Sequence, residues 1–110
     1  MYKRGEIVLI PVPFSNLSSV KKRPVLVISN TLYNYANLDI IVVAITSNLQ
    51  QNGIIINTED LITGELPKTS LIRCGKIYTL EQSIVLKSFG VISENVLKNV
   101  ANEISKLITE

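Results

Sequence analysis

Two uninterrupted runs of aliphatic residues constrain the fold of this chain more than any other feature of its sequence. Residues 24–29 read Pro-Val-Leu-Val-Ile-Ser, and residues 39–46 read Asp-Ile-Ile-Val-Val-Ala-Ile-Thr. Both runs are rich in β-branched residues and have the length of ordinary strands. A strand that is apolar at nearly every position is typical of burial on both faces. We therefore expect two interior strands at these places.

Weaker patterns predict the elements around these two runs. Further strands are expected at residues 6–11, 53–57, 69–73, 76–79 and 84–91, with loops at 16–23, 47–52 and 61–68 and a loop or helical turn at 30–37. Pro11 and Pro13 should end the first strand or place it at an edge, and Pro24 should be the first residue of its strand, because proline cannot donate a hydrogen bond within a sheet. Gly90 should mark a strand end or a bulge.

The last segment changes from a strand period to a helix period. Between Ser93 and Thr109, apolar residues recur at helical spacing, which predicts an amphipathic helix. Ser93 suits its N-cap and Lys106 suits its C-terminal end. The sequence therefore predicts a mainly β (α+β) fold, in which a small barrel of short antiparallel strands carries a C-terminal helix. Its 110 residues are expected to form one domain over residues 1–110.

The residue types that are missing limit the chemistry. The chain has no histidine and one cysteine, Cys74, so it lacks the usual general base and the ligands of a typical transition-metal site. Its nine acidic residues are scattered, apart from the pair Glu59–Asp60. We therefore expect no metal and no cofactor. One cysteine and no apolar stretch of about 18 residues indicate a cytoplasmic protein without a membrane span.

Charge is distributed unevenly along the chain. Residues 1–38 carry five basic residues and one acid, a net charge of +4, whereas residues 39–110 carry six basic and eight acidic residues, a net charge of −2. The basic half is suited to a polyanion, or it is simply a solubilising surface.

Three segments carry charged or hydroxyl side chains beside the end of a predicted strand. Arg23 lies where a basic loop, Lys21–Arg23, enters the strand of residues 24–29, and its planar guanidinium suits a phosphate. Alternatively, it is an ordinary surface arginine. Hydroxyls end the second apolar run in Thr46 and Ser47, and they either bind a phosphate oxygen or a 2′-OH or merely finish the strand. Arg73 is a second candidate phosphate-binding cation, or a partner in a cross-strand ion pair.

Four blocks of this sequence together resemble the MazF/PemK (Kid) toxins of type II toxin–antitoxin systems. They are Arg4-Gly5-Glu6-Ile7, Arg23-Pro24-Val25-Leu26-Val27-Ile28, Val43-Ala44-Ile45-Thr46-Ser47, and Ile72-Arg73-Cys74 with Thr79-Leu80. The block from Arg23 to Ile28 is fairly specific, whereas each other block alone is weak. The resemblance implies an SH3-like barrel of the CcdB/PemK type, a homodimer, sequence-selective cleavage of single-stranded RNA, and an antitoxin that blocks the site.

The resemblance also assigns roles to residues. Arg23 and Thr46 match the recurrent catalytic pair of the family, and Arg73 matches the arginine that PemK-type members use beside the scissile phosphate. Gly75 stands where PemK-type members carry an aspartate as general base, and residues 16–22 contain no acid. The expected RNA contacts come from basic and small polar residues of the neighbouring segments: Ser18, Ser19, Lys21, Lys22, Ser47, Asn48 and Lys76.

These residues support a mechanism in which the 2′-OH of RNA attacks the adjacent phosphate without a metal ion. The protein would align the nucleophile and stabilise the developing charge with arginine. Two alternatives without catalysis remain open on the same fold. One is a toxin that poisons gyrase, against which the Arg23 and Thr46 match argues. The other is an RNA-binding or protein-binding module, which the missing acids favour.

Overall fold

The computed structural model describes residues 1–13 and 20–110 of the chain. In chain order, the elements of this part are β1 (Glu6–Pro13), β2 (Val20–Val27), α1 (Thr31–Ala36), β3 (Asp39–Thr46), β4 (Ile54–Ile56), the 3-10 turn η1 (Thr58–Asp60), β5 (Leu61–Gly64), β6 (Ser70–Glu81), the 3-10 turn η2 (Gln82–Ile84), β7 (Lys87–Ile92) and α2 (Glu94–Ile108).

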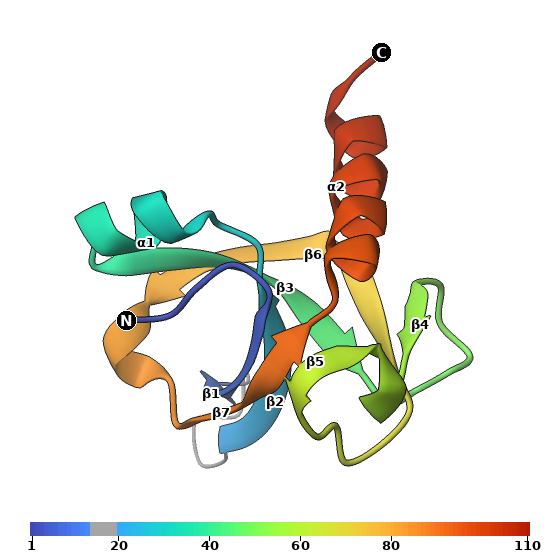
Figure 1. The fold of residues 1–110 in the computed structure, drawn as a ribbon, viewed down its shortest axis with the longest axis horizontal. Helices are drawn as coiled ribbons and strands as arrows, with labels where there is room; N and C mark the ends of the chain where they lie inside the picture. The colour runs from blue at the N-terminus through green and yellow to red at the C-terminus, as the bar shows by residue number, and fades with distance from the viewer. Residues whose placement is uncertain (14–19) are drawn as a thin grey trace.

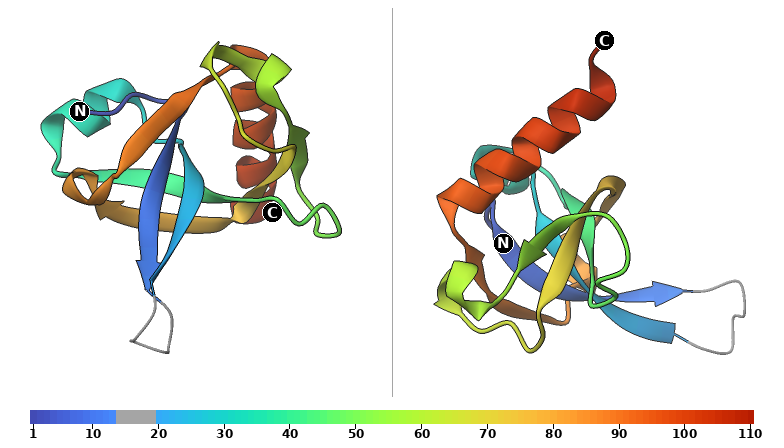
Figure 2. Two further views of the ribbon diagram at one scale, coloured as in Figure 1. Left: turned by 90° about the horizontal axis from the view of Figure 1, so that it is seen from below. Right: turned by 90° about the vertical axis from the view of Figure 1, so that its right-hand side faces the viewer.

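The strands form one strongly curled antiparallel sheet. Its order is β4-β6-β3-β2-β1-β7-β5, and every described pair of neighbours is antiparallel. The sheet bends into a half-barrel, α2 packs against one side of it, and the β1–β2 hairpin extends away from the body (Figures 1 and 2). The predicted fold, short antiparallel strands in a small barrel with a C-terminal helix, is confirmed.

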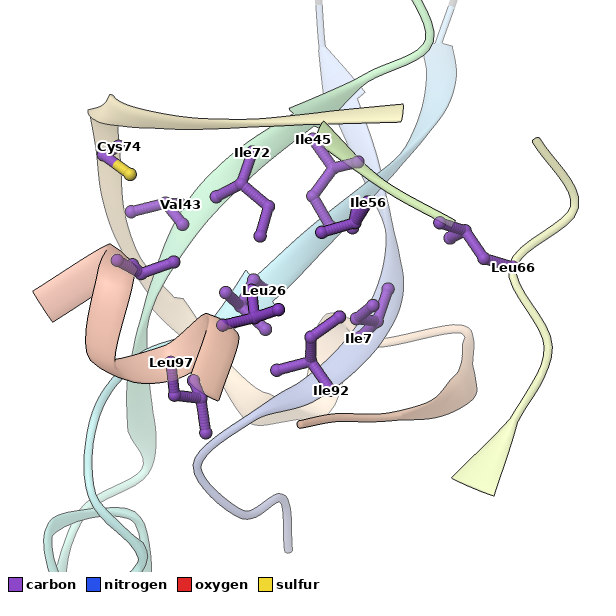
Figure 3. Close-up of a cluster of buried hydrophobic side chains, with 12 residues drawn as sticks. Ile7, Leu26, Val43, Ile45, Ile56, Leu66, Ile72, Cys74, Ile92 and Leu97 are labelled. Carbon is purple, nitrogen blue, oxygen red and sulfur yellow. The ribbon is translucent and has the colours of Figure 1, made fainter. Parts of the chain in front are cut away.

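The central strands separate two apolar clusters, because alternate residues point to opposite faces of a sheet. Leu26 and Val43 belong to the larger cluster, which α2 covers with Val96, Leu97 and Val100 (Figure 3). Their neighbours belong to the second cluster, on the other face: Val8, Ile10, Val25, Val27, Ile40 and Val42. The expected burial of β2 and β3 on both faces is confirmed.

The prediction of a loop over residues 16–23 is wrong at its C-terminal end. Lys21, Lys22 and Arg23 already belong to β2, where they pair with β1 opposite Val12, Pro11 and Ile10. Pro24 is therefore the fifth residue of the strand and not the first. Pairing with β3 begins only at Val25, so Pro24 has one neighbouring strand and its missing N–H costs no bond on the open side.

Three other strands also differ from the prediction. β1 continues to Pro13 because β2 pairs with it up to that residue. β7 pairs with β1 only up to Leu9, so Pro11 and Pro13 lie where one edge is open. Residues 61–64 form strand β5 in a segment that was predicted as a loop. The two short strands predicted around Gly75 are one strand, β6, which bulges at that point.

Helix α2 agrees with the prediction. Its N-cap is Ser93, whose Oγ accepts a hydrogen bond from the N–H of Val96 at 3.4 Å. The Arg4 guanidinium and the Glu94 carboxylate form an ion pair at 3.2 Å near the first turn. The last turns of the helix project beyond the sheet (Figure 1), which leaves Leu107 60% and Ile108 75% exposed.

Strands β5 and β7 cross at two facing glycines. Gly64 (φ +84°) pairs with Gly90 (φ +150°), and both have backbone conformations that residues with a side chain rarely adopt. A Cβ added to Gly90 would lie 2.0 Å from the carbonyl oxygen of Thr63. β7 also bulges beside this glycine, since Ile7 pairs with Gly90 and Val8 with Ser88, so the expected bulge is confirmed.

Candidate functional site

A cavity of about 540 Å³ opens on the sheet face that carries the second apolar cluster. Its walls come from β1, β2, β3 and β6, with Gln51 from the loop after β3 and Ile84 from η2. The cationic, amide and aliphatic hydroxyl side chains among its lining residues are Arg23, Thr46, Gln51, Arg73, Lys76 and Thr79. The cavity therefore gathers three positive charges.

Arg23 and Thr46 reach this cavity because of the register between β2 and β3. Val25 pairs with Ala44 in an antiparallel pair. Arg23, two residues before Val25, and Thr46, two residues after Ala44, therefore lie toward the same end of the pair and on the same face. Val25 and Ala44 also line the cavity. Two residues that are 23 positions apart in the sequence are thereby brought to one wall.

A bulge in β6 brings two cations to the cavity. Val43 pairs with Ile77, but its neighbour Ala44 pairs with Arg73, so the residues from Cys74 to Lys76 have no partner on β3. Arg73 and Lys76 both line the cavity, whereas Cys74 turns into the larger apolar cluster. Burial raises the pKa of the Cys74 thiol, and the nearby Glu103 carboxylate raises this pKa further.

Hydrogen bonds hold the polar end of the cavity in place. Thr46 Oγ1 accepts from the N–H of Asn48 at 3.1 Å, and Asn48 Oδ1 accepts from the N–H of Gln50 at 3.1 Å. The hydroxyl proton of Thr46 is then available for an oxygen atom of a ligand. Arg73 donates from Nη1 to Gln51 Oε1.

The rest of the cavity wall is apolar and includes one aromatic ring. The apolar residues come from β1, β2, β3, β6 and η2: Ile10, Pro11, Val12, Val25, Ala44, Ile45, Leu80 and Ile84. Tyr78 lies on the same wall and is 51% exposed. An apolar wall with an exposed ring beside several cations suits an unpaired base attached to a phosphate.

The structure places the expected RNA contacts unevenly. Of these, Lys76 lines the main cavity, and Lys22 and Ser47 line a second cavity of about 240 Å³ together with Lys68. Arg23 lines both cavities. Lys21 and Asn48 are exposed and line neither of these two, while Ser18 and Ser19 lie outside the described residues.

The described residues that line the main cavity include no carboxylate. Gly75, where an acid was expected from the resemblance, is exposed, and a Cβ there would contact only Leu107 Cδ1 at 3.8 Å. Among residues 1–13 and 20–110, no cluster of three His, Cys, Asp or Glu side chains is arranged to hold a metal ion. Nor does any helix in this part of the chain have the length and apolar character needed to cross a membrane.

Gln51 is the site residue that sequence reasoning missed. It lies in a polar loop, and nothing in its spacing distinguishes it from Gln50 beside it. Gln51 reaches the cavity because its loop crosses β6. This path follows from the pairing of β6 with both β3 and β4. The aliphatic wall around Tyr78 was also missed.

Known proteins resemble this chain in sequence and in fold. A family model described as PemK-like, MazF-like toxin of type II toxin–antitoxin system matches residues 3–108. The fold is similar to a MazE–MazF crystal structure from Deinococcus radiodurans, with a TM-score of 0.77 and 16% identity over 97% of this chain and 95% of that chain. It is also similar to a mycobacterial endoribonuclease in complex with its cognate antitoxin, with a TM-score of 0.74 and 15% identity over 96% and 93%. No curated protein sequence matches the chain.

Proposed function

The chain belongs to the PemK-like, MazF-like toxins of type II toxin–antitoxin systems, and from this membership we propose that it is an endoribonuclease. It cuts single-stranded RNA at selected sequences without a metal ion, and cleavage of mRNA in the cytoplasm inhibits translation and growth. The observation that carries this proposal is the meeting of Arg23, Thr46 and Arg73 around one cavity.

In the proposed reaction, the RNA supplies its own nucleophile. The 2′-OH attacks the adjacent phosphorus, the bond to the 5′ oxygen breaks, and the products are a 2′,3′-cyclic phosphate and a 5′-OH. Arg23 and Arg73 stabilise the negative charge that grows on the phosphoryl oxygens. The oxygen of the Thr46 hydroxyl already accepts a hydrogen bond from Asn48 N–H. The hydroxyl donates a hydrogen bond to a non-bridging oxygen and so orients the phosphate.

This reaction does not require a carboxylate in the cavity. Alignment of the 2′-OH with the phosphate lowers the barrier by several kcal/mol, because attack within one molecule avoids the entropy cost of bringing two reactants together. The 2′-OH proton passes to solvent or to a phosphoryl oxygen, and the departing 5′ oxygen takes up a proton from solvent. Without a general base, which typically accelerates such a step by about 10²–10⁴-fold, cleavage is slow.

The neighbouring surface would select the RNA sequence. Tyr78 offers a ring on which one base stacks, with the aliphatic side chains of Val12 and Leu80 on the same wall. Lys76 and the second cavity, with Lys22 and Ser47, extend the positive surface along the RNA backbone. The loop of residues 47–52, which carries Gln51, supplies the amide and hydroxyl groups that read base edges.

We also infer two protein partners. The solved mycobacterial endoribonuclease is bound to its cognate antitoxin, and the three cations of the cavity suit an acidic antitoxin segment that competes with RNA. A second copy of the chain is expected from the family resemblance. The exposed apolar side chains Leu107 and Ile108 at the end of α2 provide surface for such a contact.

The test is incubation of the purified protein with a long single-stranded RNA in EDTA, with mapping of the new 5′ ends. We expect cuts at a short recurring motif, no cleavage of DNA of the same sequence, and loss of cleavage in Arg23→Ala. Lys98→Ala is the matched control, because Lys98 is an exposed cation on α2 outside the cavity. Cleavage that EDTA abolishes would contradict the proposed mechanism.

A non-catalytic RNA-binding module is the second candidate, favoured by the absence of a carboxylate among the described lining residues. The same experiment separates the two functions. RNA that stays intact, but is bound by a folded protein whose affinity falls in Arg23→Ala, would establish the binding module.

A further inference from the structure

Gln51 occupies an unusual place for a loop residue, since the loop that carries it must cross a strand. β6 lies between β3 and β4 in the sheet, so the connection from Thr46 to Ile54 passes over β6. Thr46 pairs with Leu71 and Ile54 pairs with Ile72, which brings the loop beside Arg73. Gln51 lines the cavity, so the crossing takes place on its side of the strand.

The loop has a defined shape at this crossing. Bonds to Thr46 Oγ1 and Asn48 Oδ1 hold its first half, and the N–H of Gln51 donates to the carbonyl oxygen of Asn48 at 3.4 Å. At its far end, a Cβ on Gly53 would lie 2.5 Å from the carbonyl oxygen of Ile72, so the loop backbone packs directly on β6. The side chain of Gln51 is thereby directed at Arg73, whose Nη1 donates to its Oε1.

The chemistry of this contact differs from that of an ion pair. A guanidinium has five N–H donors, and the bond to Gln51 uses one of them. The acceptor is a neutral amide, so it orients the arginine without cancelling the positive charge that a phosphate requires. A carboxylate at the same place would hold the arginine equally well but would repel the phosphates of RNA.

We propose that Gln51 is a positioning residue, which holds the Arg73 guanidinium toward the scissile phosphate and acts on RNA cleavage through Arg73. Since the reaction is the nuclease function proposed above, this inference rests on that function. Fixing one long side chain changes a rate by about 3- to 10-fold, which corresponds to roughly 0.5–1.5 kcal/mol of ordering free energy. The effect should lie in kcat rather than KM, because the arginine is needed most where charge develops.

The test is a double-mutant cycle on the RNA motif that the wild type cuts. Gln51→Met keeps the length of the side chain but removes the acceptor, and Gln51→Glu restores an acceptor with a negative charge. We expect Q51M to lower kcat about 3- to 10-fold with little change in KM. Q51E should recover kcat but raise KM most strongly at low salt. In the Arg73→Ala background, Q51M should have no further effect.

The outcomes separate this inference from the proposed function. If the wild type cuts RNA but Q51M and R73A lower the rate independently, or R73A has no effect, Gln51 does not act through Arg73 and the positioning role is wrong. If the wild type cuts no RNA, the nuclease proposal fails. The cycle is then measured on affinity for a 2′-O-methyl RNA of mixed sequence, where additive effects, or none, would overturn the contact between Gln51 and Arg73 as a functional pair.

Discussion

Replacing Gly90 by alanine is expected to destabilise the protein far more than a single added methyl group suggests. The new Cβ would lie 2.0 Å from the carbonyl oxygen of Thr63 and 2.9 Å from the Cα of Gly64. Both are backbone atoms of β5, so no side chain can rotate away to make room. Since ordinary contacts begin near 3.4 Å, the strands must separate by about 1.4 Å.

The cost follows from what this separation breaks. An alanine held near the φ of Gly90, +150°, carries about 1–3 kcal/mol of backbone strain. The strands must also part, so the Gly64–Gly90 pairing and the bond from Glu65 N–H to Phe89 O are lost as well, at about 1 kcal/mol for each bond. We expect a loss of about 3–4 kcal/mol, which lowers the urea midpoint by roughly 2 M for a domain of this size.

Urea unfolding followed by circular dichroism at fixed protein concentration measures this effect. Gly75→Ala is the matched control, because its Cβ contacts only Leu107 Cδ1 at 3.8 Å and Gly75 does not have a positive φ. It should change stability by less than about 1 kcal/mol, in the stabilising direction, since glycine is costly in a strand. Equal midpoints for Gly90→Ala and wild type would refute the argument from the close crossing.

Three further outcomes are expected. Tyr78→Ala should weaken RNA affinity by about 1–3 kcal/mol while Tyr78→Phe keeps it, as measured by fluorescence anisotropy; equal loss in both variants would mean that the hydroxyl matters and not the ring. Because burial raises the pKa of Cys74 above its usual value of 9.0, the unfolded chain loses this proton first and the free energy of unfolding should fall as pH rises through 9. Cys74→Ala should remove that part of the slope in urea titrations at several pH values. Gly75→Asp should cleave RNA faster than wild type, and its rate should rise with pH between about 3 and 5, where a carboxylate ionises. Gly75→Asn should show neither effect. Equal rates for the two variants would show that an acid at this position does not act as a base.

The local sequence pattern was sufficient to predict β3 and α2. β3 begins and ends where its aliphatic run does, and α2 follows its apolar spacing and its Ser93 cap. The local pattern failed where pairing with a distant strand determines which residues are extended. Lys21–Arg23 are polar but extended because β1 pairs with them, and β6 continues past Gly75 because β3 resumes its pairing after the bulge.

The candidate site was predictable only in part for the same reason. Arg23, Thr46 and Arg73 could be chosen because each stands beside an apolar run and matches the family blocks. Their shared cavity depends on the register of β2 with β3 and on the three unpaired residues of β6. No short-range signal encodes a bulge of this kind, and none encodes the path of the loop that places Gln51.

The place of β6 in the sheet determines how much of the chain must be synthesised before the cavity can form. Arg23 and Thr46 are synthesised early, yet residues 70–81 bring Arg73, Lys76 and Tyr78 and supply the strand on which both β3 and β4 pair. A chain that ends before this strand lacks one wall of the cavity and the pairing that orders the Gln51 loop. In the nuclease proposed above, a product of translation that stops before residue 70 would therefore be inactive, because it lacks Arg73, Lys76 and Tyr78.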